Sequence, residues 1–453
     1  MEYKELIKEY KTPFYLYDIP ELKKRVDMMR EYQKNIGLCF AMKAAPLLAG
    51  YIASFVDRLE VCSPGEYEIC VRDKVAPEKI LVSGVNKTRE SMARILSLGG
   101  AAGLFTIESE EQFEILEDTA KGLAIENHLT RSDSGNNLTE KAEFKNDSIT
   151  KLRVYIRLSS GNQFGVDKAT FEKLCDKVIN SDFLELVGIH YFSGTQKSIK
   201  KIEKELAELS SYGSELKEKY SDKLAGTDGL SLEYGPGLGI DYFVKSEDTD
   251  SNKIAEKSGS SKIEEYRYNE SFLAELMDAV QKSGIENSFS DITFEHGRYI
   301  AAPCGKYFTG VADVKTTDGT NFAILEGGLH QISYFGSMAG MKVPYVDYYA
   351  TSENHGCDDN TSEKASDESS EVKDYVLAGS LCSANDILVR KISLPVLDIG
   401  DTLCFNFAGA YCATEGISLF LSRDLPAIII RDIDGNVSKV RDHIETNIYN
   451  GGY

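Results

Sequence analysis

A single lysine stands out in the first fifty residues. Lys43 lies inside the apolar run Phe40–Pro46, where it is predicted to end a buried strand. Burial can lower the pKa of an amine until it is neutral and nucleophilic. The alternative is an ordinary strand-end lysine whose ammonium reaches water along a buried stem. Lys43 is therefore a candidate covalent site if other reactive groups converge on it.

Two later stretches supply such groups. The run Leu232–Gly239 places glycines directly after a strand-like segment, where bare backbone N–H groups can hold a phosphate; a tight turn is the alternative. Glu295 and Arg298 lie three residues apart and can hold a cation and an anion, or simply pair with each other. An amine, a phosphate cup and an acid that keeps a pyridine nitrogen protonated are together what pyridoxal 5'-phosphate requires.

Composition narrows the class of protein. The chain has 453 residues, enough for two domains, and no apolar run approaches the roughly 20 residues that span a bilayer. The N-terminal residues lack an apolar signal region and the nine cysteines form no CxxC pair, so we expect a cytoplasmic protein with reduced thiols and no membrane partner. A net charge of −21 disfavours nucleic acid. Small molecules are the expected partners.

Strand-like runs alternate with helical stretches through the first two thirds of the chain, which is typical of an α/β fold. Such an alternation fits a (β/α)8 TIM-like barrel, in which chemistry collects at the carboxyl ends of the strands. The predicted strands are Gly37–Ala44, Arg58–Ser63, Ile80–Ser83, Gly103–Ser109, Arg153–Ser159, Leu186–Phe192, Leu230–Tyr234 and Asp291–His296.

The pattern changes at about Tyr307 to short alternating runs, which predict a C-terminal β-rich domain of the β-sandwich or barrel-like kind. We therefore expect a barrel over residues 36–306, with 1–35 and 307–453 forming the second domain around an N-terminal strand near Tyr15 to Tyr17. Three polar segments, 126–147, 245–262 and 351–373, look like disordered insertions without chemistry.

Several motifs resemble one family, the alanine-racemase-like barrel (fold-type III) decarboxylases that use pyridoxal phosphate and include diaminopimelate, ornithine and arginine decarboxylases. FAMKAAP resembles the lysine motif of the family, SPGE and FTIES its strand ends, GPGLG its phosphate loop and EHGR its EPGR. GSLCSAND and GAY resemble two motifs of its second domain. The resemblance runs from about Thr12 to Pro426 in the right order.

The resemblance implies roles for individual residues. Lys43 would bond the cofactor aldehyde, Glu295 would pair with the pyridinium, and Phe192 appears where relatives stack a histidine on the ring. Cys382 would protonate the carbon left when CO2 departs. It also implies a homodimer with shared active sites, which Cys382 and Tyr411 would enter from the neighbouring subunit. The other residues implied at the phosphate or substrate are Thr195, Gly237, Gly239, Arg298, Tyr411, His190, Ser383 and Gln331.

The substrate is less constrained. Ser383 stands where relatives that act on basic amino acids carry an acid, and the segment Gly327–Tyr334 lacks the arginine of diaminopimelate decarboxylases. That segment resembles a butirosin-pathway branch that acts on a glutamyl group tethered to an acyl-carrier protein. Lys197, Lys200, Lys201 and Lys204 could dock such a carrier, although a solvated helix face is the simpler interpretation. A racemase, a basic or diaminopimelate decarboxylase and a catalytically inactive regulatory homologue are the alternatives.

Overall fold

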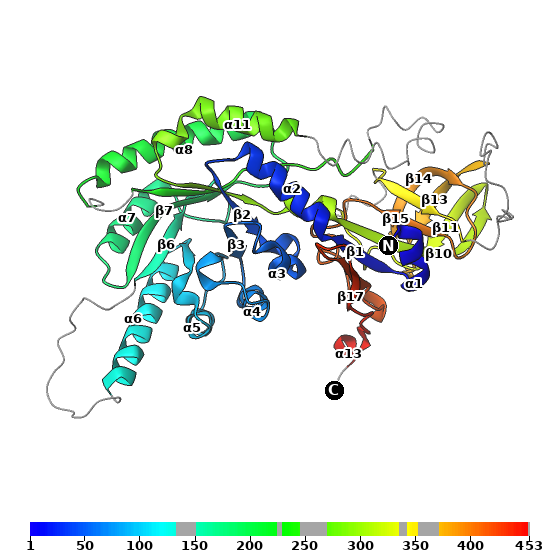
Figure 1. Ribbon diagram of the computed structural model, residues 1–453, viewed down its shortest axis with the longest axis horizontal. Helices are drawn as coiled ribbons and strands as arrows, with labels where there is room; N and C mark the ends of the chain where they lie inside the picture. The colour runs from blue at the N-terminus through cyan, green and yellow to red at the C-terminus, as the bar shows by residue number, and fades with distance from the viewer. Residues whose placement is uncertain (133–150, 224–228, 245–269, 335–341, 352–370, 452–453) are drawn as a thin grey trace. The chain divides into compact units, whose positions relative to one another are not determined.

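The computed structural model describes residues 1–132, 151–223, 229–244, 270–334, 342–351 and 371–451. They form two compact units (Figure 1). The barrel unit comprises Val26–Gly239 and Glu270–Gly297, and the sheet unit comprises Met1–Arg25, the described residues 240–244, and the chain from Arg298 onward.

Eight parallel strands close into a barrel, which confirms the predicted architecture. The barrel closes where β2 pairs with β9, with Cys39 beside Glu295. All eight predicted strands are present, as β2 (Gly37–Ala41), β3 (Arg58–Val61), β4 (Ile80–Val82), β5 (Leu104–Ile107), β6 (Leu152–Arg157), β7 (Leu184–Phe192), β8 (Ser231–Gly235) and β9 (Ile292–His296). The predicted bounds differ from these by one to three residues at one or both ends of each strand. The difference that concerns the site is in β2, which ends at Ala41, so that Lys43 lies in the 3-10 turn η1 (Met42–Ala44).

Amphipathic helices follow most of the barrel strands. They are α3 (Ala49–Ile52), α4 (Pro64–Arg72), α5 (Arg89–Ser97), α6 (Glu110–Ser132), α7 (Lys168–Ile179), α8 (Ile199–Tyr220) and α11 (Ser271–Ser283), while α2 (Ile19–Tyr32) precedes the first strand. Helix α8 buries Leu206, Leu209 and Leu216 on one face and lies beside α11 (Figure 1). At the start of α4, Ser63 Oγ accepts a 3.1 Å hydrogen bond from the Glu66 N–H and so caps the helix.

The sheet unit is built on a mixed sheet in the order β14-β13-β11-β10-β1-β16-β17, with β15 paired to β10 and β12 paired to β15. Strand β1 (Phe14–Asp18) lies between β10 and β16, antiparallel to the first and parallel to the second. The remaining strands are β10 (Gly305–Thr317), β11 (Thr320–Leu325), β12 (Val346–Tyr349), β13 (Val372–Ala378), β14 (Ile387–Pro395), β15 (Thr402–Phe405), β16 (Ala427–Arg431) and β17 (Val437–Arg441).

The core of this sheet joins segments from both ends of the chain. Leu6 of α1 (Tyr3–Glu9) is fully buried against Phe14, Phe308 and Ile429. Burying large apolar side chains from such distant segments contributes about 1.5–3 kcal/mol each and fixes β1 inside the sheet.

Most of the predicted insertions lie outside the described residues, which exclude 133–150, 245–269 and 352–370. Two predicted boundaries are corrected, because α6 continues to Ser132 and β13 begins at Val372. Within the described part of the chain, no helix combines the length and the apolar character that crossing a bilayer requires.

Candidate active site

Lys43 points at a buried acid. Its Nζ lies 2.6 Å from Oε2 of Glu60, whose side chain is 2% exposed, and 3.7 Å from Sγ of Cys62. Burial alone would raise the pKa of Glu60, but the Lys43 ammonium lowers it to about 2. The apolar surroundings that the sequence suggested for Lys43 are therefore corrected: a carboxylate on the next strand faces the amine.

Across the barrel interior, His190 of β7 meets Glu295 of β9. The imidazole Nε2 and carboxylate Oε1 lie 3.0 Å apart, and both side chains are buried. Phe192, two residues further along β7, has its ring centroid 6.0 Å from Lys43 Nζ. Because alternate residues of a strand share a face, His190 and Phe192 both line the interior that Lys43 and Glu295 occupy. The Nδ1 atom of His190 has no hydrogen-bond partner among the described residues.

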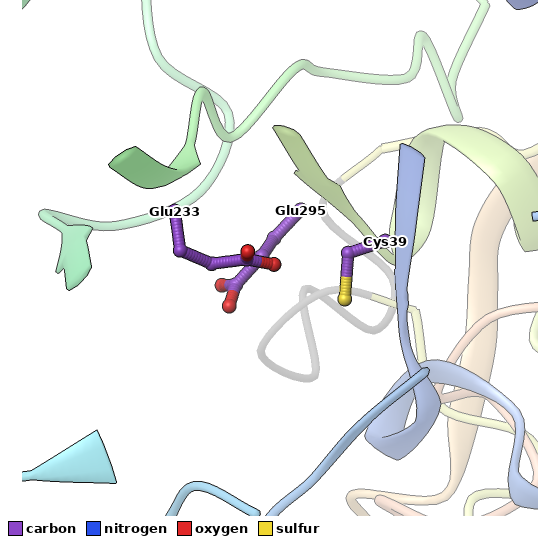
Figure 2. Close-up of side chains that lie close together, drawn as sticks. All are labelled: Cys39, Glu233 and Glu295. Carbon is purple, nitrogen blue, oxygen red and sulfur yellow. The ribbon is translucent and has the colours of Figure 1, made fainter. Parts of the chain in front are cut away.

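A second buried glutamate lies beside Glu295. The Cys39 thiol and the carboxylates of Glu233 and Glu295 have polar atoms within 4.8 Å of one another (Figure 2). Arg58 forms an ion pair with Glu233, yet burial and the charge of Glu295 together raise the pKa of Glu233 to about 8. At neutral pH the Glu233 carboxyl is therefore largely protonated.

The sequence could have signalled this acid. Glu233 stands within the apolar run that precedes the glycine loop, two residues before Gly235, and this spacing puts it on the inward face of β8. Its nearness to Glu295 depends on the pairing of β8 with β9, in which Glu233 lies opposite Thr293.

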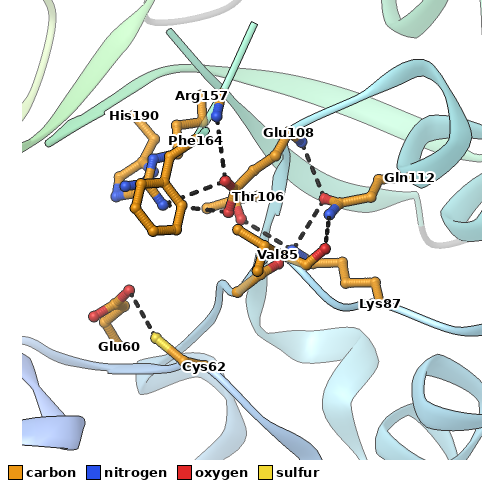
Figure 3. A network of polar contacts seen from close by, with 12 residues as sticks. Glu60, Cys62, Val85, Lys87, Thr106, Glu108, Gln112, Arg157, Phe164 and His190 are labelled. Carbon is orange, nitrogen blue, oxygen red and sulfur yellow. Dashed lines mark hydrogen bonds and ion pairs between the residues drawn. The ribbon is translucent and has the colours of Figure 1, made fainter. Parts of the chain in front are cut away.

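A polar network lines another part of the barrel (Figure 3). Arg157 Nη1 lies 3.3 and 3.4 Å from the two carboxylate oxygens of Glu108, and its guanidinium carbon is 4.8 Å from the centroid of the Phe164 ring. Beside this pair, Lys87 Nζ donates to Thr106 Oγ1 and Gln112 Oε1, both at 3.2 Å. Burial lowers the pKa of Lys87 to about 8. Glu108 stands in the FTIES motif, whereas none of the motifs quoted above contains Lys87.

The glycine loop after β8 is tightly enclosed. Gly237 has a φ of +62°, and a Cβ there would overlap the carbonyl oxygen of Gly194; a Cβ at Gly239 would overlap the Gln196 side chain. The loop after β7 therefore rests directly on the glycine loop, with Thr195 exposed on it. A bare backbone turn of this kind fits a phosphate group, although Pro236 contributes no N–H.

Arg298 and Tyr411 lie together in the sheet unit. The guanidinium carbon of Arg298 is 4.4 Å from the Tyr411 ring centroid, and Arg298 Nη1 donates a 2.8 Å hydrogen bond to Tyr242 Oη. Tyr411, which the resemblance assigned to the site of a neighbouring subunit, therefore contacts an arginine of its own chain. This contact needs no second subunit.

The loop with Cys382 and Ser383 also belongs to the sheet unit. The Asp386 carboxylate accepts 2.8 Å hydrogen bonds from the N–H groups of Leu381 and Leu329, so it ties this loop to the segment that contains Gln331. Cys382 is exposed.

Gln331 is engaged in the fold at both ends of its amide. It accepts a 2.6 Å hydrogen bond from Tyr307 Oη and donates a 2.8 Å one to the Asp424 carbonyl. These bonds favour a supporting role for Gln331 over the predicted contact with substrate.

The barrel unit thus brings Lys43, His190, Phe192 and Glu295 together and places the glycine loop on the same strand ends. A cavity of about 590 Å³ elsewhere in this unit is lined by Tyr191, Glu205 and Tyr212 among others, and contains none of the predicted site residues. Its walls come from the segment between Leu158 and Lys168, from Tyr191 of β7 and from α8, so we do not assign the chemistry to it.

Comparison with known proteins agrees with this geometry. A family model described as "pyridoxal-dependent decarboxylase, pyridoxal binding domain" matches residues 20–302. The chain is 25% identical over 438 residues to the L-glutamyl-[BtrI acyl-carrier protein] decarboxylase of Niallia circulans, covering 94% of this chain and 90% of that protein. It is 24% identical over 422 residues to the diaminopimelate decarboxylase of Campylobacter jejuni, covering 91% and 89%.

Solved structures show the same fold. The diaminopimelate decarboxylase of Helicobacter pylori in complex with L-lysine superposes with a TM-score of 0.70 at 20% identity, covering 99% of this chain and 98% of that one. The lysine/ornithine decarboxylase of Vibrio vulnificus in complex with cadaverine gives a TM-score of 0.66 at 17% identity, covering 94% and 97%. Since the family model spans more than half of the chain, this protein belongs to the pyridoxal-dependent decarboxylases, with pyridoxal phosphate as its cofactor.

Proposed function

We propose that this protein decarboxylates an amino acid, or an amino-acyl group on a carrier protein, whose far end carries no free ammonium. The observation that supports this most strongly is the convergence in one barrel of Lys43 facing Glu60, and of His190 facing Glu295. The family match adds the cofactor class.

Each residue has a defined task in this proposal. Bound pyridoxal phosphate supplies an electron sink for the electron pair that remains when the carboxylate leaves as CO2. Lys43 would hold the cofactor through its aldehyde group, and Glu60 would hold the Lys43 ammonium when the amine is free. Glu295 would pair with the ring nitrogen, and His190 would orient that side chain through their 3.0 Å contact.

The phosphate and the proton donor come from loops. Gly237 and Gly239 offer bare backbone to the phosphate, and Arg298 and Tyr411 add a cation and an aromatic wall. Cys382, exposed on its loop, delivers the proton to the substrate carbon from the neighbouring subunit of a homodimer. Thr195 and Phe192 border the phosphate and the ring. We place this enzyme in the cytoplasm.

The substrate's far end is inferred from Ser383. A neutral hydroxyl cannot offset the desolvation of an ammonium as a carboxylate does, and the loss of such a charge-assisted bond costs about 1.5–3 kcal/mol, or roughly ten- to a hundredfold in affinity. The relative from Niallia circulans, whose name describes a glutamyl group on an acyl-carrier protein, also supports a substrate without a free ammonium at its far end.

The lysines suggested for carrier docking give less support to a carrier-bound substrate. Lys197 is buried, so it cannot form part of a carrier-docking surface. Lys201 and Lys204 lie 3.9 and 3.7 Å from the carboxylates of Glu205 and Glu208 on the same helix, which partly offsets their charge.

Two other activities use the same fold. A racemase is disfavoured by Glu295, because a carboxylate opposite the ring nitrogen favours full electron withdrawal and hence loss of CO2. A catalytically inactive homologue is disfavoured by the retention of Lys43, Glu295 and Cys382 together.

The test measures CO2 release from lysine, ornithine, meso-diaminopimelate, glutamate and a carrier-bound glutamyl group. We expect turnover only with a neutral or tethered far end, and we expect Ser383→Asp to gain activity on lysine and ornithine. Rapid turnover of a free diamino acid by the unchanged enzyme, at about 10 per second, would contradict the substrate proposal. Inversion of the α-carbon without CO2 release would point to a racemase.

A further inference from the structure

Lys197 is a buried lysine without a role in the proposed chemistry. Only 2% of its side chain is exposed. Its Nζ lies 2.6 Å from Oε2 of Glu205 and 2.9 Å from the carbonyl oxygen of Gly235, with Ser193 Oγ at 3.3 Å and Tyr234 Oη at 3.4 Å. A buried ammonium requires such a complete set of acceptors, because an unpaired one costs several kcal/mol.

The same residue holds the glycine loop with its backbone. The Lys197 N–H donates a 3.1 Å hydrogen bond to the Gly237 carbonyl. Its Cε also occupies the space beside Gly237, since a Cβ there would lie 3.0 Å from it. One residue thus fixes the carbonyl groups of both Gly235 and Gly237, which lie on either side of Pro236.

These two bonds set the direction of the loop's remaining donors. In a planar trans peptide the carbonyl and the following N–H point in opposite directions. Because the Gly237 carbonyl points toward Lys197, the N–H of Leu238 points away from it. Pro236 has no N–H, so the glycine loop offers few hydrogen-bond donors to a phosphate. The orientation of each remaining N–H therefore has a larger effect on phosphate binding.

Glu205 balances the charge behind the loop. Its carboxylate accepts from Tyr234 Oη at 2.8 Å and from Ser193 Oγ, and Lys201 approaches it to 3.9 Å. Lys197 and Glu205 therefore form a nearly neutral cluster between β8 and α8. Such a cluster holds the loop in place without presenting a free cation of its own to a ligand.

We propose that Lys197 is a positioning residue that orients the glycine loop toward the cofactor phosphate. This proposal depends on the assignment of the phosphate to Gly237 and Gly239. It predicts that losing Lys197 weakens the binding of the phosphate group selectively, whereas a lysine that only supports the barrel would affect the whole cofactor.

The experiment compares two ligands on cofactor-free protein, pyridoxal 5'-phosphate and 5'-deoxypyridoxal, which lacks the phosphate. Dissociation constants are measured from the absorbance of the lysine-bound aldehyde. For Lys197→Met we expect the preference for the phosphate form to fall roughly tenfold or more, the scale of lost charge-assisted bonds, with little change for 5'-deoxypyridoxal. Lys87→Met is the matched control, because Lys87 is equally buried in the same barrel but contacts neither loop; its preference should match that of the unchanged protein.

Lys197→Met leaves Glu205 buried without its cation, so Lys197→Met with Glu205→Gln is tested in parallel, and thermal melting establishes that the variants fold. Equal weakening of both ligands in these variants would overturn the proposal and leave Lys197 a structural residue. If the unchanged protein does not prefer the phosphate form, the phosphate assignment itself fails, and the role of Lys197 fails with it.

Discussion

The proton on Glu233 makes the pH dependence of folding a direct test of the buried carboxyl pair. Burial and the neighbouring Glu295 raise the pKa of Glu233 from 4.5 to about 8. Between these values the folded state binds one more proton than the unfolded state, so the free energy of unfolding falls as pH rises. One pH unit corresponds to about 1.4 kcal/mol, and the range from pH 5 to 8 therefore removes up to about 4 kcal/mol.

Glu233→Gln removes this titration while keeping the shape of the side chain. The replacement alters the contact of Glu233 with Arg58, but the folded-state carboxyl is largely protonated below pH 8, so this cost varies little over the range. The decisive quantity is the difference between the two proteins in how steeply the free energy of unfolding changes with pH. We expect the stability of the variant, relative to the unchanged protein, to rise steadily from pH 5 to pH 8.

The assay is denaturant unfolding of cofactor-free protein at closely spaced pH values, and Glu185→Gln is the control because Glu185 is an exposed glutamate on β7. Burial lowers the pKa of His330 from 6.5 to about 4, so this residue also changes stability between pH 5 and 6.5, but equally in both proteins. Glu60, with its pKa lowered to about 2, loses its contribution only as pH falls below about 4.5. Lys87 and Lys197, with pKa values lowered to about 8, gain stability only above pH 8. Parallel profiles for the unchanged protein and Glu233→Gln would refute the reasoning.

Three further outcomes follow from the site. Borohydride should fix the cofactor to a peptide that contains Lys43, and Lys43→Ala should abolish this labelling; labelling elsewhere would move the site. Mixing inactive Lys43→Ala with inactive Cys382→Ala should restore some activity through hybrid dimers, whereas no recovery after proven subunit exchange would indicate sites built within one chain. Gly237→Ala should weaken cofactor binding at least tenfold, because its φ of +62° and the overlap with Gly194 strain any side chain; unchanged affinity would show that the loop is adaptable.

The barrel could be predicted from the sequence because each strand is a short apolar run bounded by turn residues, and the eight runs alternate with helical periods. The strands of the sheet unit are harder to predict from the sequence. Strand β17 has an exposed pattern and gains its partner only from β16, while β14 pairs with β13 through irregular register. Such edge strands carry little local signal.

The candidate site likewise has a part that the sequence predicts and a part that it does not. Lys43, Glu295 and the glycine loop stand in distinctive local motifs, so they could be found. The Glu60 partner of Lys43, the proximity of Glu233 to Glu295, and the contact of Tyr411 with Arg298 depend on strand register and on long-range pairing. No spacing within a motif encodes these contacts.

The position of β1 has a consequence for how the protein is made. This strand leaves the ribosome before any barrel strand, yet one of its two neighbours, β16, begins only at Ala427. The barrel strands, Gly37 to His296, are all synthesised in between. The barrel can thus fold while β1 still waits for a partner, and its exposed apolar edge is then open to association with other nascent chains. We expect that release of a chain truncated before Ala427 gives an aggregating product even though its barrel sequence is complete.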